Sequence, residues 1–282
     1  MRPVFYGLPS GSAMIELKYP VLLVHGMGFR DRKRICYWGR IPKRLEREGV
    51  RVFFGGQDSN GSLDGNASFL AERITALAAE HKIEKFNVIA HSKGGLEMRK
   101  AITHLGIAPY VASLTTVSTP HRGSKTVDFF MKMPAWLMKA GCAACDLWFR
   151  ILGDKKPRTF EAVKALTTKA AEEFNKETPD VPGIYYQSFA FTFKTNRSDM
   201  TMFLPHLVVK HFECENDGLV TPESAEWGDF RGTFTGNSNR GVSHCDEVDM
   251  RRHRLTKREG DGISDIPEFY AGIVNELAER GF

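Results

Sequence analysis

The most constraining feature of this sequence is a short apolar run at residues 86–90 that stops at a serine and passes into a helical pattern. Residues 90–94 (AHSKG) predict a strand, a sharp turn and a helix. A serine hydroxyl is a weak nucleophile, so a reactive one must stand clear of the backbone and face a base. Small residues two positions either side of Ser92 leave room for the strand and the helix. Ser92 is therefore a candidate nucleophile, and an ordinary turn that contains a serine is the alternative.

A second apolar run at residues 21–24 leads directly into His25, Gly26, Met27 and Gly28. A continuous apolar run is typical of a parallel strand covered on both faces. Two glycines after such a strand suggest a loop whose backbone approaches another group closely. Beside a nucleophilic serine, the backbone N–H groups of Met27 and Lys93 are the candidate donors to an oxyanion. A plain glycine turn is the alternative.

The rest of the first half alternates strands with helices. Apolar runs at 51–54 and 111–117 read as strands, and helical spacing covers 38–48 and 68–80. A further strand is expected at 184–191. This alternation predicts an α/β fold with a mostly parallel, doubly wound sheet.

Residues 126–179 depart from that alternation because their pattern is helical only. We expect a helical insertion here, and a core built from residues 1–125 and 180–282. Its large apolar residues suggest a lid that lines an acyl-binding groove; a helical cap with its own core is the alternative. The pocket candidates are Phe129, Phe130, Met133, Trp136, Leu137 and Trp148.

An acid and a histidine follow the insertion, and the resulting chain order of serine, aspartate and histidine is the one expected of the α/β-hydrolase fold. Asp217 lies in an Asn-Asp-Gly turn, and His244 lies 27 positions later in a loop of small and polar residues. His244 is the candidate base, and Asp217 is the candidate acid that orients it. Asp199 and Asp229 are the competing acids.

Composition excludes several other classes of protein. The net charge of +5 is mild, and no basic stripe with interleaved aromatic residues suggests nucleic-acid binding.

The CxxC at 142–145 reads as two small apolar residues on a helix, with zinc or redox chemistry as the alternative. No run reaches the length of a membrane span, and no leader is apparent. We expect a cytoplasmic protein if Met1 is the native start, and a secreted one if a leader has been removed.

Six blocks of sequence carry a family resemblance. They are VLLVHGM at 21–27, YWGRIP at 37–42, AHSKGG at 90–95, STPHRGS at 118–124, NDGLV at 216–220 and HCDEV at 244–248. Together they resemble the bacterial true lipases, the triacylglycerol lipases typified by Pseudomonas and Burkholderia enzymes, in the α/β-hydrolase superfamily. The resemblance implies a triad of Ser92, Asp217 and His244, an oxyanion hole at Met27 and Lys93, and a lid formed by the insertion.

The resemblance also implies a structural calcium ion near the histidine loop. Asp246 matches one ligand, and Asp199 is the candidate for a second. A third ligand position falls at Met250, and a thioether binds calcium poorly. The alternative is a surface carboxylate cluster. No cofactor is expected to be required for the chemistry itself.

The sequence therefore predicts a serine carboxylic ester hydrolase, most simply a lipase for acylglycerol esters that contacts a lipid interface transiently. An esterase for shorter-chain or polyester substrates is the first alternative. A non-catalytic scaffold that binds a lipid or a protein is the second. We also expect the side chain of Lys93 to face solvent.

Overall fold

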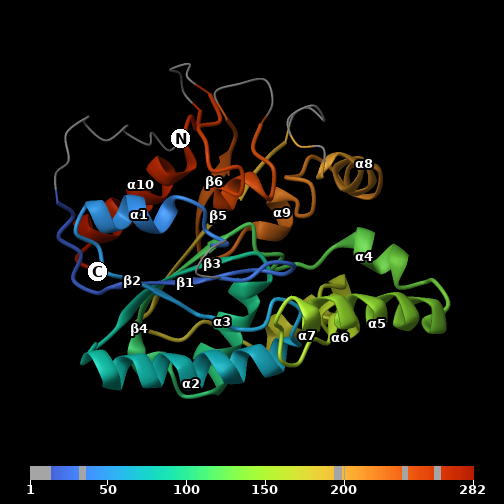
Figure 1. The fold of residues 1–282 in the computed structure, drawn as a ribbon, viewed down its shortest axis with the longest axis horizontal. Coiled ribbons are helices and arrows are strands. Elements are labelled where there is room, and N and C mark those ends of the chain that lie inside the picture. The colour runs from blue at the N-terminus through green and yellow to red at the C-terminus, as the bar shows by residue number, and fades with distance from the viewer. Residues whose placement is uncertain (1–13, 32–35, 194–198, 200, 237–240, 257–261) are drawn as a thin grey trace.

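The computed structural model describes residues 14–31, 36–193, 199, 201–236, 241–256 and 262–282. Within them a six-stranded sheet has the order β2-β1-β3-β4-β5-β6, and each pair of neighbours is parallel (Figure 1). The strands are β1 (Val21–Val24), β2 (Val52–Phe54), β3 (Phe86–His91), β4 (Val111–Val117), β5 (Tyr185–Phe191) and β6 (Asp229–Phe234). The predicted parallel α/β architecture is confirmed.

Helices cover both faces of the sheet (Figure 1). On one face, α1 (Ile41–Arg47) and α10 (Ile266–Glu279) pack on a core that includes Trp38. On the other face, α2 (Leu63–His81) and α3 (Lys93–His104) form a second core. Strands β1, β3 and β4 are buried along their whole length, which explains the continuous apolar run of β1 and the largely apolar sequence of the other two.

Two elements differ from the sequence expectation. Helix α2 begins five residues before the predicted 68–80, because Ser62 caps it by accepting a hydrogen bond from the Gly65 N–H. Strand β6 was not predicted. It lies at the edge of the sheet, is only partly buried and contains Gly232, so it lacks the apolar run of the central strands.

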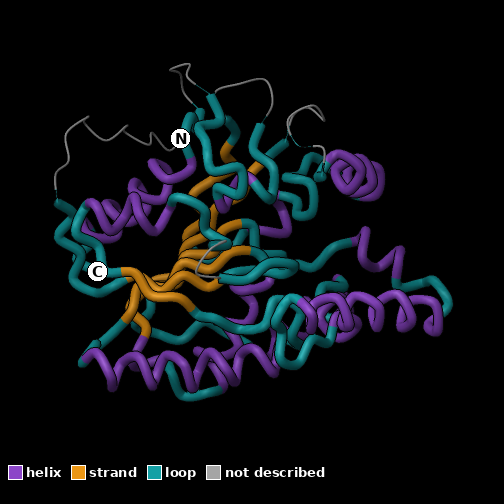
Figure 2. Tube along the Cα trace, in the orientation of Figure 1, coloured by secondary structure: helices purple, strands orange, loops and turns teal. Residues whose placement is uncertain are grey.

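Between β4 and β5 the chain forms four helices beyond the carboxyl ends of the strands (Figure 2). They are α4 (Lys125–Phe130), α5 (Ala135–Ile151), α6 (Thr159–Lys164) and α7 (Thr168–Glu177). In α5, Cys142 is the one buried residue, so this helix does not enclose a core of its own. Helix α8 (Phe203–Phe212) lies against α4.

The remaining elements are short: η1 (Ala108–Tyr110), α9 (Pro222–Ala225) and η2 (Asp246–Val248). Among the helices that the structure describes, none combines the length and the apolar character needed to span a bilayer.

Candidate active site

Ser92 lies in a strained turn between β3 and α3. Its backbone has φ 55° and ψ −133°, a conformation that a side-chain-bearing residue rarely adopts. The turn is held by Thr119, whose hydroxyl donates a 2.7 Å hydrogen bond to the carbonyl of Ser92. Gly94 passes so close to β1 that an added Cβ would lie 2.5 Å from the carbonyl oxygen of His25. The spacing of small residues in the sequence thus has a steric cause.

Replacing Gly94 with alanine is expected to destabilise the protein by about 1–3 kcal/mol and to lower activity, because the methyl group displaces the backbone at His25. Gly141 in α5 is the matched control, since a Cβ there meets nothing within 4 Å. Gly141→Ala should be neutral or slightly stabilising. Urea unfolding and ester hydrolysis measure both variants, and equal stability of the two would contradict the steric explanation.

Asp217 and His244 form a buried pair. His244 Nδ1 lies 2.8 Å from Asp217 Oδ2, and the His244 N–H donates to the carbonyl of Asp217 at 2.8 Å. The other carboxylate oxygen accepts 2.8 Å hydrogen bonds from the N–H groups of Leu219 and Val220. Burial opposes ionisation, but the imidazole and these hydrogen bonds hold the pKa of Asp217 at about 2. The acid is therefore ionised and fixed against one nitrogen of the ring.

The imidazole of His244 also lies beside the nucleophile turn. Its ring centroid is 4.4 Å from that of His91, the residue before Ser92. Because Nδ1 is engaged by Asp217, Nε2 is the nitrogen left for a serine hydroxyl. Within the described residues no hydrogen bond joins Ser92 to His244. Such bonds are often long without substrate and shorten when it binds.

The two candidate oxyanion donors flank Ser92. Met27 follows Gly26, where an added Cβ would lie 2.7 Å from the Cβ of Ser92. Lys93 is the first residue of α3, at the positive end of the helix. In the described part of the chain neither backbone N–H has an acceptor, so both are available. The next residue of the loop, Gly28, donates to Asn60 Oδ1 at 3.2 Å.

The side chain of Lys93 is buried, and the expectation that it faces solvent was wrong. Its ammonium group donates to the carbonyl of Gly61 at 3.0 Å and contacts the carboxylate of Glu97. Asn66 donates to that carboxylate at 2.7 Å. Burial raises the pKa of Glu97, and Lys93 partly opposes this. The i, i+4 spacing of Lys93 and Glu97 was the signal that could have revealed the pair.

A second buried chain of polar groups lies behind the triad candidates, and the sequence analysis missed it. Tyr37 Oη is 2.7 Å from His91 Nδ1, and His91 Nε2 is 3.0 Å from Glu247 Oε2. Glu247 Oε2 is also 4.0 Å from His244 Nδ1. Burial and the neighbouring charge of Asp217 raise the pKa of Glu247 well above its usual value, and burial lowers the pKa of His91. His91 is therefore neutral near pH 7, and the neutral form of Glu247 is favoured over its carboxylate.

His91, His244 and Glu247 are also the described residues whose ligand atoms lie close enough together to hold a metal ion. A hydrogen bond between His91 and Glu247 and one between His244 and Asp217 already engage ligand atoms of all three residues. The arrangement thus serves hydrogen bonding around the imidazole of His244.

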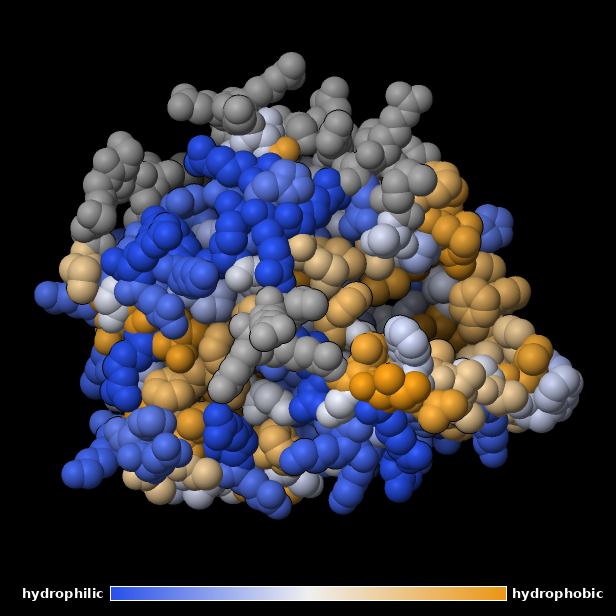
Figure 3. All heavy atoms as spheres, in the orientation of Figure 1, coloured by the Kyte–Doolittle hydropathy of each residue, from blue (hydrophilic) through white to orange (hydrophobic). Residues whose placement is uncertain are grey.

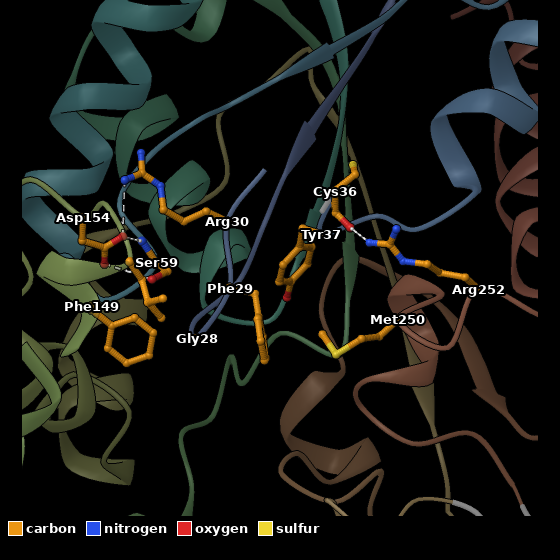
Figure 4. A pocket seen from close by; sticks show the side chains of 11 residues that line it. Gly28, Phe29, Arg30, Cys36, Tyr37, Ser59, Phe149, Asp154, Met250 and Arg252 are labelled. Carbon is orange, nitrogen blue, oxygen red and sulfur yellow. Dashed lines mark hydrogen bonds and ion pairs between the residues drawn. The ribbon is translucent and has the colours of Figure 1, made fainter. Parts of the chain in front are cut away.

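A cavity of about 450 Å³ lies beside the loop that follows β1 and contains Gly28 and Phe29 (Figure 4). Phe29, Phe149 and Met250 point into it from three different parts of the chain, and Leu152 adds a further apolar wall. At one side, Arg30 pairs with Asp154 at 3.5 Å. The cavity is predominantly apolar, which suits a hydrocarbon chain.

The insertion reaches this cavity through residues that the sequence analysis did not select. Phe149 and Leu152 line it. The six predicted pocket residues are exposed instead, and apolar atoms gather over α4, α5 and α8 around a hollow (Figure 3). Phe129 stacks on Phe212 of α8 with ring centroids 4.4 Å apart. The six predicted pocket residues that are exposed are Phe129, Phe130, Met133, Trp136, Leu137 and Trp148.

The two calcium candidates lie beside an arginine. Asp246 and Asp199 lie near each other, but the guanidinium group of Arg251 approaches both, with Nε 2.6 Å from Asp246 and Nη2 4.0 Å from Asp199. Asp249 is engaged elsewhere, because it accepts a 2.7 Å hydrogen bond from the Arg40 N–H. The cluster is therefore arranged around arginines.

Comparison with known proteins agrees with this geometry. Residues 20–249 match the family described as palmitoyl protein thioesterase. The chain is 30% identical over 262 residues to triacylglycerol lipase 2 of Saccharomyces cerevisiae, covering 88% of this chain and 75% of that protein. It is 32% identical over 176 residues to the triacylglycerol lipase of Burkholderia plantarii, covering 57% of this chain and 48% of that lipase.

The solved structure of a metagenomic carboxyl esterase superposes with a TM-score of 0.74 at 17% identity, covering 97% of this chain and 80% of that chain. At this identity the superposition demonstrates a shared fold. The chain therefore belongs to the palmitoyl protein thioesterase family, and with it to the α/β-hydrolase lipases and esterases.

Proposed function

We propose that this chain is a serine carboxylic ester hydrolase, and specifically a lipase that cleaves long-chain acylglycerol esters. The observation that carries the proposal is the buried Asp217–His244 pair beside the strained turn of Ser92. An ionised acid, an oriented imidazole and a partly exposed serine hydroxyl are the parts of an acyl-enzyme mechanism. The related triacylglycerol lipases support the same reaction class.

In the first half of the reaction the Ser92 hydroxyl attacks the ester carbonyl while His244 Nε2 takes its proton. Asp217 keeps the other proton of the ring on Nδ1 and stabilises the imidazolium that forms. The N–H groups of Met27 and Lys93 bind the oxyanion of the tetrahedral intermediate. His244 then donates its proton to the alcohol oxygen, the C–O bond breaks and the alcohol leaves.

In the second half a water molecule takes the place of the alcohol. His244 removes a proton from the water as the water attacks the acyl-enzyme carbonyl, and the same two N–H groups bind the second oxyanion. Collapse of that intermediate breaks the bond to Ser92 and returns the proton to its hydroxyl. The products are a free acid and the original enzyme.

The apolar cavity beside Gly28 and Phe29 is our candidate for the acyl-chain site. The exposed apolar side chains of α4, α5 and α8 support transient contact with a lipid interface, with α4 and α5 acting as a lid. In the described part of the chain, Trp136 (72% exposed) and Ile151 (71% exposed) are the most exposed large apolar side chains.

Hydrolysis of p-nitrophenyl esters of increasing chain length tests this proposal. We expect kcat/KM to rise from butyrate to longer chains, and the rate to increase when substrate exceeds its solubility limit. An esterase for short or polyester substrates would show a rate that collapses as the chain lengthens. A palmitoyl thioester belongs in the same panel because of the family description, and Ser92→Ala supplies the background rate in each case.

A further inference from the structure

We propose that Arg251 serves as a built-in cation between Asp199 and Asp246, and so holds the His244 loop in place without a metal ion. Arg251 is a positioning residue, because it acts on His244 through the two carboxylates and Ser243. The stability part of this inference is independent of the proposed function. The part that concerns catalysis rests on His244 acting as the base.

The two carboxylates bind Ser243, the residue before His244. The Ser243 hydroxyl donates to Asp199 Oδ2 at 2.7 Å, and its N–H donates to Asp246 Oδ2 at 3.3 Å. The Asp246 N–H donates back to the Ser243 hydroxyl at 3.2 Å. Ser243 is fully buried, so the position of the following imidazole depends on these contacts.

Two carboxylates this close together repel each other when both are ionised. Asp246 is 1% exposed and Asp199 is 9% exposed, so water screens their charges poorly. The guanidinium group of Arg251, with Nε 2.6 Å from Asp246 Oδ1, supplies the compensating positive charge.

The oxygen atoms of this cluster do not form a calcium cage. Calcium takes six to eight oxygen ligands at about 2.3–2.6 Å. Asp199 Oδ1 already accepts hydrogen bonds from the N–H and hydroxyl groups of Thr201 and from the Met202 N–H. Asp246 Oδ1 faces Arg251, and Met250 offers a thioether that lines the cavity. Hydrogen-bond donors thus engage both oxygens of Asp199 and Oδ2 of Asp246. Within the described residues Asp246 Oδ1 accepts no hydrogen bond, and its charge is balanced by the guanidinium group of Arg251.

The experiment measures the thermal midpoint Tm of the wild type, Arg251→Ala and Arg251→Lys, each with EDTA and with added Ca²⁺, together with kcat for a p-nitrophenyl ester. The wild type should keep its Tm within about 1 °C in both solutions. Arg251→Ala should lose about 5 °C or more, because two buried carboxylates lose their counter-charge. Its kcat should fall about tenfold with little change in KM. Arg251→Lys keeps the charge and should recover part of both losses.

Arg254→Ala is the matched control, because Arg254 lies in the same segment but is 59% exposed and pairs with Asp265 at 3.4 Å. Its Tm should stay within about 2 °C of the wild type. Two results would overturn the proposal. One is a wild-type Tm that falls in EDTA and returns with Ca²⁺, which would assign the role to a metal ion. The other is an Arg251→Ala variant with the Tm and kcat of the wild type.

Discussion

Replacing Ser92 with alanine is expected to lower ester hydrolysis by roughly 10⁴- to 10⁶-fold while the fold is retained. The substitution removes the nucleophile and leaves the buried Asp217–His244 pair in place. Alanine also lacks the hydroxyl that a fluorophosphonate probe labels. Steady-state hydrolysis, mass-spectrometric detection of the labelled peptide and Tm together measure these expectations.

Ser264→Ala is a control serine substitution outside the nucleophile turn, and it should keep both activity and labelling. A wild-type protein that hydrolyses no ester and takes up no probe would instead support the non-catalytic scaffold. Full activity in the Ser92 variant would assign the chemistry to another residue. Neither result would disturb the expected dependence of Tm on Arg251.

Acidification is expected to reduce the contribution of three buried histidines to stability, because these histidines are neutral in the native state. Burial lowers the pKa of His25 to about 4 and holds those of His91 and His121 well below the usual 6.5. Below about pH 6.5 the unfolded chain binds protons that the native state does not, so stability falls as the pH falls. In that range each such histidine lowers the free energy of unfolding by about 1.4 kcal/mol for every unit by which the pH falls.

Glu247 acts in the opposite direction. Its raised pKa keeps it protonated in the native state where the unfolded carboxyl has lost its proton, so its contribution grows as the pH falls toward 4.3. Burial also raises the pKa of Asp31 to about 7 and raises the pKa of Glu97, so these carboxyls oppose the histidines in the same way. The net loss of stability between pH 6 and pH 5 is therefore smaller than the roughly 4 kcal/mol per pH unit that three histidines alone would give.

Urea unfolding at a series of pH values measures this slope. His121→Gln should flatten it by up to about 1.4 kcal/mol per pH unit, whereas His81→Gln, at an exposed position, should leave it unchanged. A slope that His121→Gln leaves unchanged would show that this buried imidazole opens to solvent at little cost.

The sequence alone determined the features that depend on neighbouring residues. The buried strands, the turn at Ser92 and the order of Ser92, Asp217 and His244 follow from apolar runs, small residues and turn chemistry within a few positions. The parallel sheet follows from the alternation of strands and helices. Edge strand β6 was not predicted, because a half-exposed strand has no apolar run in its sequence.

Only the tertiary structure decided which distant side chains meet. Glu247 lies 156 positions from His91 in the sequence. The buried pair of Lys93 and Glu97 is completed by groups from another segment, because Gly61 accepts a hydrogen bond from Lys93 and Asn66 donates one to Glu97. An exposed apolar helix face and a cavity wall have the same composition, so the choice of Phe149 over Trp148 depends on how α5 docks. Likewise, aspartates that suit a metal ion and aspartates that bind an arginine are identical in sequence. Their role is set by the cation that folding brings between them, because a buried charge is stable only beside its partner.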